Sequence, residues 1–454
     1  MLHAAELRRE FRPMMRLAAP LALAELGWMA MGVVDTIMAG PLGAAAVGAG
    51  SLGAMMFFPI AICGTGLLLG MDTLVAQAFG RSDLRDCRRT LVNGVWLGAA
   101  LSPLLVLVLW ATIPLLRAVG TNPRALAIFE PYLKALTIGV LPLLLYTAFR
   151  RYLQAVNLVK PITFALVSAN LINIAGDWAL MYGHCGAPAL GVPGSGFSTS
   201  ISRTYMAAVL LGAILWHERK SGNLLFSISW WPDSARIRRL VALGLPAAGQ
   251  ILFEGAVFGI VTAMAARLDE ASLAAHGIAV NVISTTFMVP LGISSAAAVR
   301  VGQACGRKDP RGAATAGSAA LLLSATFMGA AGLALWLVPQ SIVRIYIRDT
   351  AVVSMGALLL RIAAVFQLFD GLQVTATGAL RGLGDTRTPM LAHLVGYWVI
   401  GLPTAYVLCF PLGWGAPGIW VGLSAALILI GAALALVWRR AILEGVSSGV
   451  GKQS

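Results

Sequence analysis

Long apolar stretches, separated by short polar or arginine-rich breaks, follow one another along almost the whole sequence. A helix that crosses a bilayer needs roughly 20 mainly apolar residues, and twelve stretches are long enough. They centre on residues 17–38, 47–76, 91–116, 128–148, 162–183, 195–216, 240–266, 273–301, 313–336, 352–377, 390–410 and 417–438. The pattern predicts an all-α polytopic membrane protein with twelve transmembrane helices.

The composition fits a protein that is solvated mainly by lipid. Apolar residues make up 58% of the 454 positions and charged residues only 11%, whereas soluble domains carry roughly 25% charged residues. The five cysteines stand singly, without a CxxC pair or a histidine at metal spacing, so we expect no disulfide, zinc site or cofactor. Glu25 and Asp35 interrupt the first apolar stretch, which favours a transmembrane helix over a cleaved signal peptide.

The basic residues alternate between the two sides of the predicted helices. Of the 33 Lys and Arg residues, 24 lie in breaks on one side and 6 on the other, while Arg203, Arg300 and Arg361 lie inside helices. Positively charged loops remain cytoplasmic, so both termini are predicted to be cytoplasmic. The net charge of +14 is therefore a sign of membrane topology, and no nucleic-acid partner is expected.

The chain repeats itself at an offset of 226 residues. Without a gap, this offset aligns Pro20 with Pro246, Met38 with Met264, Gln77 with Gln303, Gly80 with Gly306, Arg81 with Arg307, Asp83 with Asp309, and Arg85 with Arg311. Each half holds six predicted helices, and an even number inserts both halves in the same orientation. We therefore expect two six-helix lobes related by a parallel internal repeat, with a substrate cavity between them. The expected domains are residues 1–216 and 240–454, joined by a cytoplasmic linker at 217–239.

Six of the 19 acidic residues fall inside predicted helices. They are Glu25, Asp35, Asp72, Asp177, Glu254 and Asp370. A charge near the bilayer centre costs at least roughly 2.5 kcal/mol, so each acid is a candidate for function. The alternative for any one of them is that its carboxyl only binds a neighbouring helix by hydrogen bonds. Asp72, close to a helix end, fits a gate or helix-end role better than transport chemistry.

Asp35 and a pair on the fifth predicted helix form the first candidate site. Asn173 and Asp177 are four residues apart and share one helix face, with the weaker candidate Asn170 one turn earlier. Carboxylates and amide oxygens suit either a proton or a Na⁺ ion. The cluster is predicted to take the coupling ion.

Glu254 and Asp370 form the second candidate site, in the second half of the chain. Aromatic residues flank both acids, among them Phe253 and Phe369. Carboxylates beside aromatic rings can bind a delocalised organic cation by ion pairing and cation-π contact. Glu25 is an equal candidate for this cavity and for a plain helix contact. As ligands for Na⁺, the acids Asp35, Asp177, Glu254 and Asp370 are all candidates.

Several segments resemble the multidrug and toxic compound extrusion family, over essentially the whole chain. They are AAPLALAELGWMAMGVVDTIMAG near the start, LVAQAFGR at 74–81, FEGAVFG at 253–259, VGQACGR at 301–307 and FDGLQVTATGALRGLGDTRTP at 369–389. The resemblance implies two six-helix lobes and export of cationic, often aromatic compounds against an inward Na⁺ or H⁺ gradient. We expect the protein to act as a monomer in the bacterial inner membrane.

The resemblance is closest to the NorM-like branch of that family. In this branch an Asp of the first helix, a Glu of the seventh and an Asp of the tenth carry the acid chemistry, which implies Asp35, Glu254 and Asp370 here. Asn173 and Asp177 match the polar cluster of the N-terminal lobe in prokaryotic members. Acids are thus present in both lobes, and either lobe could bind the ion.

Two other functions fit the sequence less well than multidrug export. A lipid-linked sugar flippase of the same superfamily would need a cavity rich in Arg and Lys for the diphosphate, whereas only three arginines lie inside the predicted helices against six acids. A membrane-embedded enzyme would need a nucleophile with a base, or metal ligands. The five histidines are scattered, and no HExxH or GxSxG run occurs.

The charge asymmetry makes a prediction about topology. A reporter fused after Ser454 should behave as a cytoplasmic domain, because the break that contains the C-terminus belongs to the arginine-rich side. Alkaline phosphatase and green fluorescent protein fusions at this position measure the side directly. Phosphatase activity in the periplasm would contradict the even number of helices.

Overall fold

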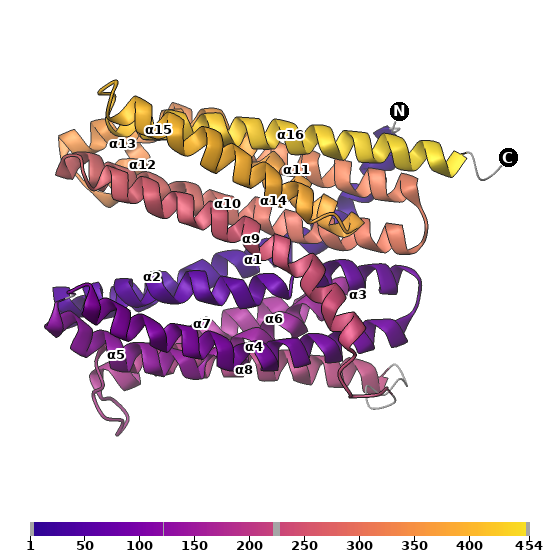
Figure 1. Cartoon of the computed structure of the whole chain (residues 1–454), viewed down its shortest axis with the longest axis horizontal. Coiled ribbons are helices and arrows are strands. Elements are labelled where there is room, and N and C mark those ends of the chain that lie inside the picture. Colours follow the sequence, from indigo (N-terminus) through magenta and orange to yellow (C-terminus); the bar gives the residue numbers. More distant parts are fainter. Residues whose placement is uncertain (1–3, 121, 221–227, 451–454) are drawn as a thin grey trace. The chain divides into compact units, whose positions relative to one another are not determined.

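The computed structural model describes residues 4–120, 122–220 and 228–450, and this part of the chain is helical without strands (Figure 1). In the first half the helices are α1 (Ala4–Ala39), η1 (Gly40–Leu42), α2 (Ala44–Leu67), α3 (Gly70–Gly80), α4 (Leu84–Ala118), α5 (Pro123–Ile138), α6 (Val140–Ala155), α7 (Lys160–Tyr182) and α8 (Val192–Lys220). In the second half they are α9 (Ser234–Ala265), α10 (Glu270–Gly306), α11 (Pro310–Leu337), α12 (Pro339–Tyr346), α13 (Thr350–Leu383), α14 (Arg387–His393), η3 (Leu394–Gly401), α15 (Leu402–Cys409) and α16 (Ala416–Val450).

The number of transmembrane helices agrees with the hydropathy pattern. Eleven helical stretches among the described residues are long and apolar enough to cross a membrane, and the bent pair α5 and α6 makes a twelfth. This pair bends by 40° next to Gly139. Apolar side chains such as Ile37, Met55 and Leu171 are exposed on the helices, as lipid contact requires. The prediction of an all-α polytopic membrane protein is confirmed.

The internal repeat appears in the local structure of two turns. Ser82, between α3 and α4, and Lys308, between α10 and α11, both adopt the left-handed conformation, with φ of 61° and 59°. The next residue, Asp83 or Asp309, caps the following helix. Each carboxylate accepts a hydrogen bond from the backbone N–H three residues later, at 2.9 and 2.8 Å. The offset of 226 residues thus marks equivalent positions in the fold.

The chain forms two compact units, and each draws residues from both halves of the sequence. One unit is Met1–Ala22 with Gly249–Ser454, and the other is Leu23–Ala248. The helices α1 and α9 are each divided between the units, after Ala22 and after Ala248. These two points are equivalent in the repeat, so the exchange of helix segments is reciprocal.

Glycines allow the exchanged segments to pack closely within each unit. A Cβ atom at Gly292 of α10 would overlap the backbone of Ala22, and one at Gly66 of α2 would lie 2.7 Å from the Cα atom of Ala248. Both contacts leave no room for a side chain. An ion pair also joins α1 to α10, because Arg300 donates to both carboxylate oxygens of Glu10 at 2.7 and 2.8 Å.

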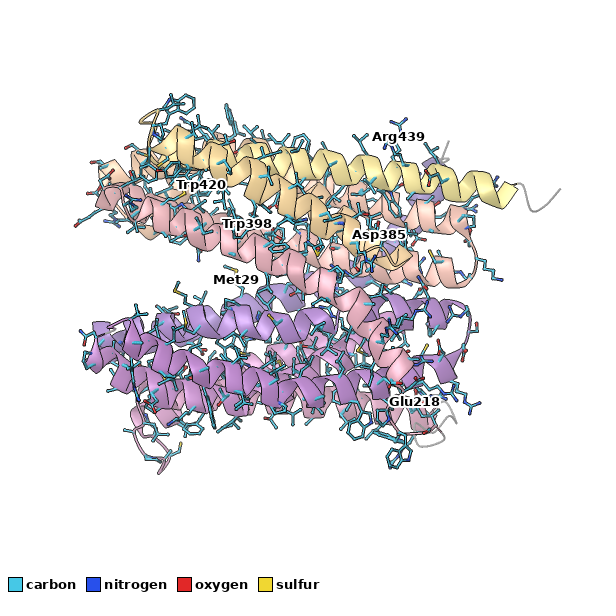
Figure 2. All side chains as sticks on the ribbon, in the orientation of Figure 1. Met29, Glu218, Asp385, Trp398, Trp420 and Arg439 are labelled. Carbon is cyan, nitrogen blue, oxygen red and sulfur yellow. The ribbon has the colours of Figure 1, made fainter. Side chains whose placement is uncertain are left out.

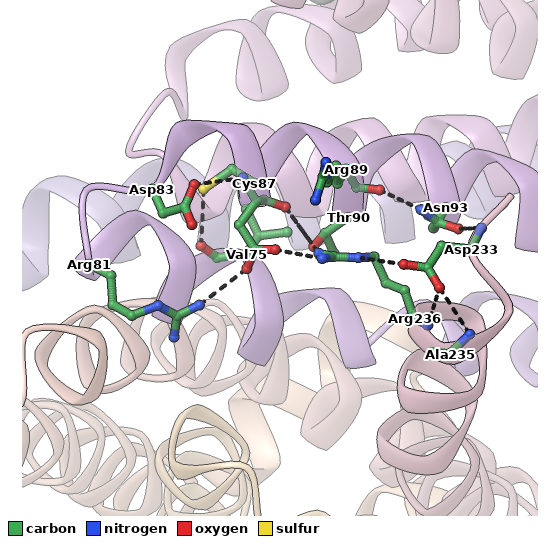
Figure 3. A network of polar contacts seen from close by, with 11 residues as sticks. Val75, Arg81, Asp83, Cys87, Arg89, Thr90, Asn93, Asp233, Ala235 and Arg236 are labelled. Atoms are coloured by element: carbon green, nitrogen blue, oxygen red, sulfur yellow. Dashed lines mark hydrogen bonds and ion pairs between the residues drawn. The ribbon is translucent and has the colours of Figure 1, made fainter. Parts of the chain in front are cut away.

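Polar contacts attach the start of α9 to α4 (Figure 3). Arg236 pairs with the Asp86 carboxylate at 2.6 Å and donates to the hydroxyl of Thr90 at 2.7 Å. The backbone N–H of Asp233 donates to the side-chain oxygen of Asn93 at 2.7 Å. The first turn of α9 is therefore fixed to α4 in the unit Leu23–Ala248. From Gly249 on, α9 and the helices that follow it belong to the other unit.

The predicted domains, 1–216 and 240–454 with the linker 217–239, follow the order of the chain. Helix α8 continues to Lys220, and residues 221–227 of the predicted linker lie outside the described residues. The compact units differ from the sequence division because short segments of α1 and α9 pack with the other half. The domain boundaries stay a prediction.

Candidate ion and substrate sites

The acids inside the helices fall into two groups, according to whether an arginine faces them. In the first group, Glu25 pairs with Arg150, and Asp72 pairs with Arg151 at 3.2 Å. Both arginines lie on α6, at neighbouring positions, so one helix supplies two counter-charges. These pairs could not be predicted from the sequence, because each joins residues that are far apart in the chain.

A third acid of this group was missed altogether. Glu218, near the end of α8 (Figure 2), is 4% exposed and was counted with the linker. Its carboxylate accepts hydrogen bonds from Arg88 at 2.7 Å and from the hydroxyl of Tyr152 at 2.9 Å. The signal for this pair was weak, because Glu218 stands in the polar run HERKSGN at 217–223, which is typical of an exposed loop.

Asp35, Asn173 and Asp177 come together in the unit Leu23–Ala248. Asp35 projects from α1 beside the side chains of Asn173 and Asp177 on α7. The hydroxyl of Thr199 on α8 donates to Asp35 at 3.2 Å. Asn173 and Asp177 are fully buried. The three predicted residues therefore form one polar cluster, and α8 contributes a hydroxyl that the sequence analysis did not include.

A close contact between α7 and α8 holds this cluster in place. Gly176, between the two polar residues of α7, lies so near Ser198 that a Cβ atom there would be 2.5 Å from the serine hydroxyl. The hydroxyl of Ser198 donates to the backbone oxygen of Asn173 at 2.8 Å. The Asn173 amide donates back to the same hydroxyl at 3.3 Å. Asn170, one turn earlier, instead donates to the backbone oxygen of Gly27, which supports a helix contact for it.

The cluster has more acceptor oxygens than donors. Among the described residues, both carboxyl oxygens of Asp177, one of Asp35 and the amide oxygen of Asn173 are buried and lack a hydrogen-bond donor. Neither Asp35 nor Asp177 forms a direct ion pair with an arginine among the described residues, although the charge of Arg203 acts on Asp35 through space. Oxygen atoms in this state need a proton or a cation to be stable away from water. The donor set fits Na⁺, through carboxyl and amide oxygens, or H⁺ on a carboxyl.

Glu254 and Asp370 belong to the other unit and are joined by a chain of polar side chains. Asp370 accepts a hydrogen bond from Gln373 at 3.2 Å, and Gln373 contacts His393 Nε2 at 2.7 Å. His393 Nε2 lies 3.8 Å from the Glu254 carboxylate, and the hydroxyl of Tyr397 donates to the same carboxylate at 3.4 Å. The structure thus brings the two predicted acids into one network.

His393 is the central residue of this network, and the sequence analysis missed it. It is fully buried, and its Nδ1 lies 2.8 Å from the backbone oxygen of Pro389, which can only accept a hydrogen bond. Nδ1 therefore carries a proton. The other ring nitrogen, Nε2, lies near both the Gln373 oxygen and the Gln250 amide nitrogen, at 2.7 and 3.4 Å. A histidine inside the eleventh apolar stretch was the signal that could have identified it.

The aromatic residues beside these acids have different surroundings. The ring of Phe253 packs edge-to-face on Trp398, with centroids 6.3 Å apart, and its backbone oxygen accepts a hydrogen bond from the indole at 3.3 Å. Phe369 packs against α16 where Gly431 has no side chain. Both rings are partly exposed. Their role in substrate binding stays a prediction.

The charged residues do not gather into a site for a transition metal. No group of three or more His, Cys, Asp or Glu side chains among the described residues is arranged to hold a metal ion. The four candidate Na⁺ ligands instead form two separate pairs, Asp35 with Asp177 and Glu254 with Asp370. Each pair would need amide, hydroxyl or backbone oxygens to complete a shell around Na⁺.

Comparison with known proteins matches the chain to one family twice. The MatE family model matches residues 20–179 and again residues 246–407, in agreement with the internal repeat. The probable multidrug resistance protein NorM of Mesorhizobium japonicum is 37% identical over 445 residues, which cover 95% of this chain and 94% of that protein. The multidrug resistance protein PmpM of Pseudomonas aeruginosa is 34% identical, with coverage of 96% and 92%.

Solved structures show the same fold at low sequence identity. The eukaryotic MATE transporter AtDTX14 superposes with a TM-score of 0.86 at 19% identity, over 97% of this chain and 99% of that one. A MATE family transporter in an outward-facing conformation gives a TM-score of 0.88 at 18% identity, with coverage of 96% and 97%. The predicted two-part helical fold is confirmed by these similarities.

The contact of Glu25 with Arg150 leads to a prediction about stability. The substitution Glu25→Gln should lower the free energy of unfolding by about 3–5 kcal/mol, because it leaves a buried guanidinium without its counter-charge. The double variant Glu25→Gln, Arg150→Gln should recover much of this loss. Unfolding of the purified protein in detergent measures both. A stable single variant would contradict a structural role for the pair and favour the predicted role of Glu25 in substrate binding.

Proposed function

Because this chain belongs to the MatE family, the multidrug and toxic compound extrusion transporters, we propose that it exports cationic or aromatic organic compounds in exchange for Na⁺ or H⁺. The observation that carries the proposal is the buried cluster of Asp35, Asn173 and Asp177, whose oxygens outnumber their donors. The names of the relatives support multidrug export over a lipid-linked sugar flippase or a membrane enzyme.

The N-terminal cluster supplies the coupling step in this proposal. Two carboxyls that lie side by side repel each other when both are ionised, and neither forms a direct ion pair with an arginine among the described residues. A proton or Na⁺ ion removes this repulsion and draws α1 towards α7. Without the ion, an arrangement that gives the carboxyls access to water is favoured. The ion therefore selects between two arrangements of α1, as alternating access requires.

The C-terminal network supplies the substrate step. Glu254 and Asp370 offer negative charge, and the ring of Phe253 next to Glu254 offers a surface for stacking or cation-π contact. An organic cation and the arriving ion then compete for the same carboxylates, so release of one accompanies entry of the other. Polar contacts through Gln373 and His393 connect the two acids, so a charge that binds at one acid also affects the other.

The proposed setting is the bacterial inner membrane, with both termini cytoplasmic and the chain acting as a monomer. The arginine asymmetry of the loops supports the orientation. The bacterial relatives support the setting, and the presence of both six-helix units in one chain supports a monomer. Small organic molecules and the lipid bilayer are the expected partners, and the coupling ion takes the place of a cofactor.

The coupling role of Asp35 can be tested in inverted vesicles. With wild-type protein, an imposed ΔpH or ΔpNa should drive dye transport, and Asp35→Asn or Asp177→Asn should abolish it, because each substitution keeps the shape and removes the ionisable group. Asp349→Asn is a matched control, because Asp349 caps α13 through the N–H of Val352 and Asn caps equally well. Normal efflux by well-expressed Asp35→Asn and Asp177→Asn would exclude this role.

The substrate role of Glu254 and Asp370 can be tested by equilibrium binding. Glu254→Gln and Asp370→Asn should each weaken binding of a monovalent cationic dye to the purified protein by about 1–3 kcal/mol, the range of a charge-assisted contact. The binding affinity of neutral compounds should fall less in both variants. In the wild type, dye affinity should fall as Na⁺ rises or as pH drops. A dye affinity that responds to neither would refute direct competition, and dye binding unchanged in both variants would assign the acids to ion coupling or to structure.

A further inference from the structure

A cavity of about 170 Å³ lies within the unit Leu23–Ala248, and neither Asp35 nor Asp177 is among its lining residues. Its walls are aromatic and basic. Trp28, Phe57, Phe58 and Tyr146 line it together with three arginines, whereas Glu25 is the only acid among the lining residues that the structure describes. Trp28 and Tyr146 lie nearly parallel, with ring centroids 6.3 Å apart. The proposed function, which rests on acids, makes no use of this cavity.

Arg203 of α8 is the unusual residue in the wall of this cavity. Its side chain is 7% exposed, and neither Nε nor Nη1 has a hydrogen-bond acceptor among the described residues. The guanidinium carbon lies 4.5 Å from the centroid of the Phe57 ring. A buried guanidinium with unused donors is costly unless a partner satisfies them.

The bend between α5 and α6 provides the space for this arginine. A Cβ atom at Gly139, the bend residue, would lie 3.1 Å from Cδ of Arg203 and 2.8 Å from the hydroxyl of Ser200. A larger residue at position 139 would therefore overlap with the side chains of Ser200 and Arg203 on α8. The position of the Arg203 side chain is therefore set by the close packing of α8 against the bend at Gly139.

The other two arginines of the cavity wall are each paired with a carboxylate, whereas Arg203 is not. Arg150 pairs with Glu25, and Arg151 pairs with Asp72. Asp35 acts on Arg203 through space, but no carboxylate of the described residues forms an ion pair with its guanidinium. Arg150 also keeps its Nε without an acceptor. The cavity therefore presents net positive charge and unused N–H donors beside aromatic rings.

We propose that this cavity binds an aromatic carboxylate, with Arg203 holding the carboxylate group and the aromatic walls holding the ring. A guanidinium matches a carboxylate in a two-pronged contact, which an ammonium cannot form. A cavity of about 150 Å³ accommodates benzene, so the volume of about 170 Å³ suits a one-ring acid. The site extends the class of ligands beyond cations, and its use in export rests on the proposed function.

Binding of 4-fluorobenzoate to the purified full-length protein, followed by ¹⁹F NMR, tests the site. The neutral analogue 4-fluorobenzamide should bind at least tenfold more weakly. The substitution Arg203→Gln should weaken benzoate binding at least tenfold, and Arg203→Lys should give an intermediate loss because it keeps the charge without the fork. Arg361→Gln, at an exposed arginine of α13, should leave benzoate binding unchanged.

A second variant protects the test against misfolding of the arginine variants. Phe58 is half exposed and lines the cavity, so Phe58→Ala should fold normally and weaken benzoate binding several-fold. Benzoate that binds no better than the benzamide, or binding that ignores both Arg203→Gln and Phe58→Ala, would overturn the proposal. If benzoate binding depends on Arg203 while the wild type fails to export cationic dye, the site stands and the proposed export function falls.

Discussion

A carboxylate that is buried away from water in a membrane protein is stable only if it pairs with a positive charge, takes up a proton or binds a cation. In this protein that constraint divides the acids. Glu25, Asp72 and Glu218 each meet an arginine, and each pair ties one helix to another. Asp35 and Asp177 lie beside each other, and neither forms a direct ion pair with an arginine among the described residues. The paired acids hold the bundle together, which leaves the unpaired acids available for an ion that comes and goes.

The features that depend on local sequence could be predicted. The apolar stretches predicted the helices because a span has a fixed length, and the turn around Asp83 is repeated at Asp309 because the same residues cap the next helix. Asn173 and Asp177 were expected on one face because they are four residues apart. Their meeting with Asp35 rested on the family resemblance as much as on spacing, since nothing in the local sequence relates α1 to α7.

The features that depend on packing could not be predicted in the same way. Glu25 was an equal candidate for substrate and for helix contact, and only the position of Arg150, 125 residues away, shows its partner. His393 was set aside with the scattered histidines because its importance comes from Gln373 on another helix. The exposed arginine Arg361 and the buried Arg203 looked alike in the sequence. Burial and partner, which separate them, are properties of the fold.

The division of α1 and α9 between the compact units has the form of a domain swap inside a single chain. Two copies of a six-helix ancestor that exchanged their first segments would have formed a dimer with the same contacts as those of Gly292 at Ala22 and Gly66 at Ala248. Gene fusion would then have joined the partners without breaking either contact. A gene cut at the repeat boundary should accordingly yield two fragments that are stable only when they are produced together.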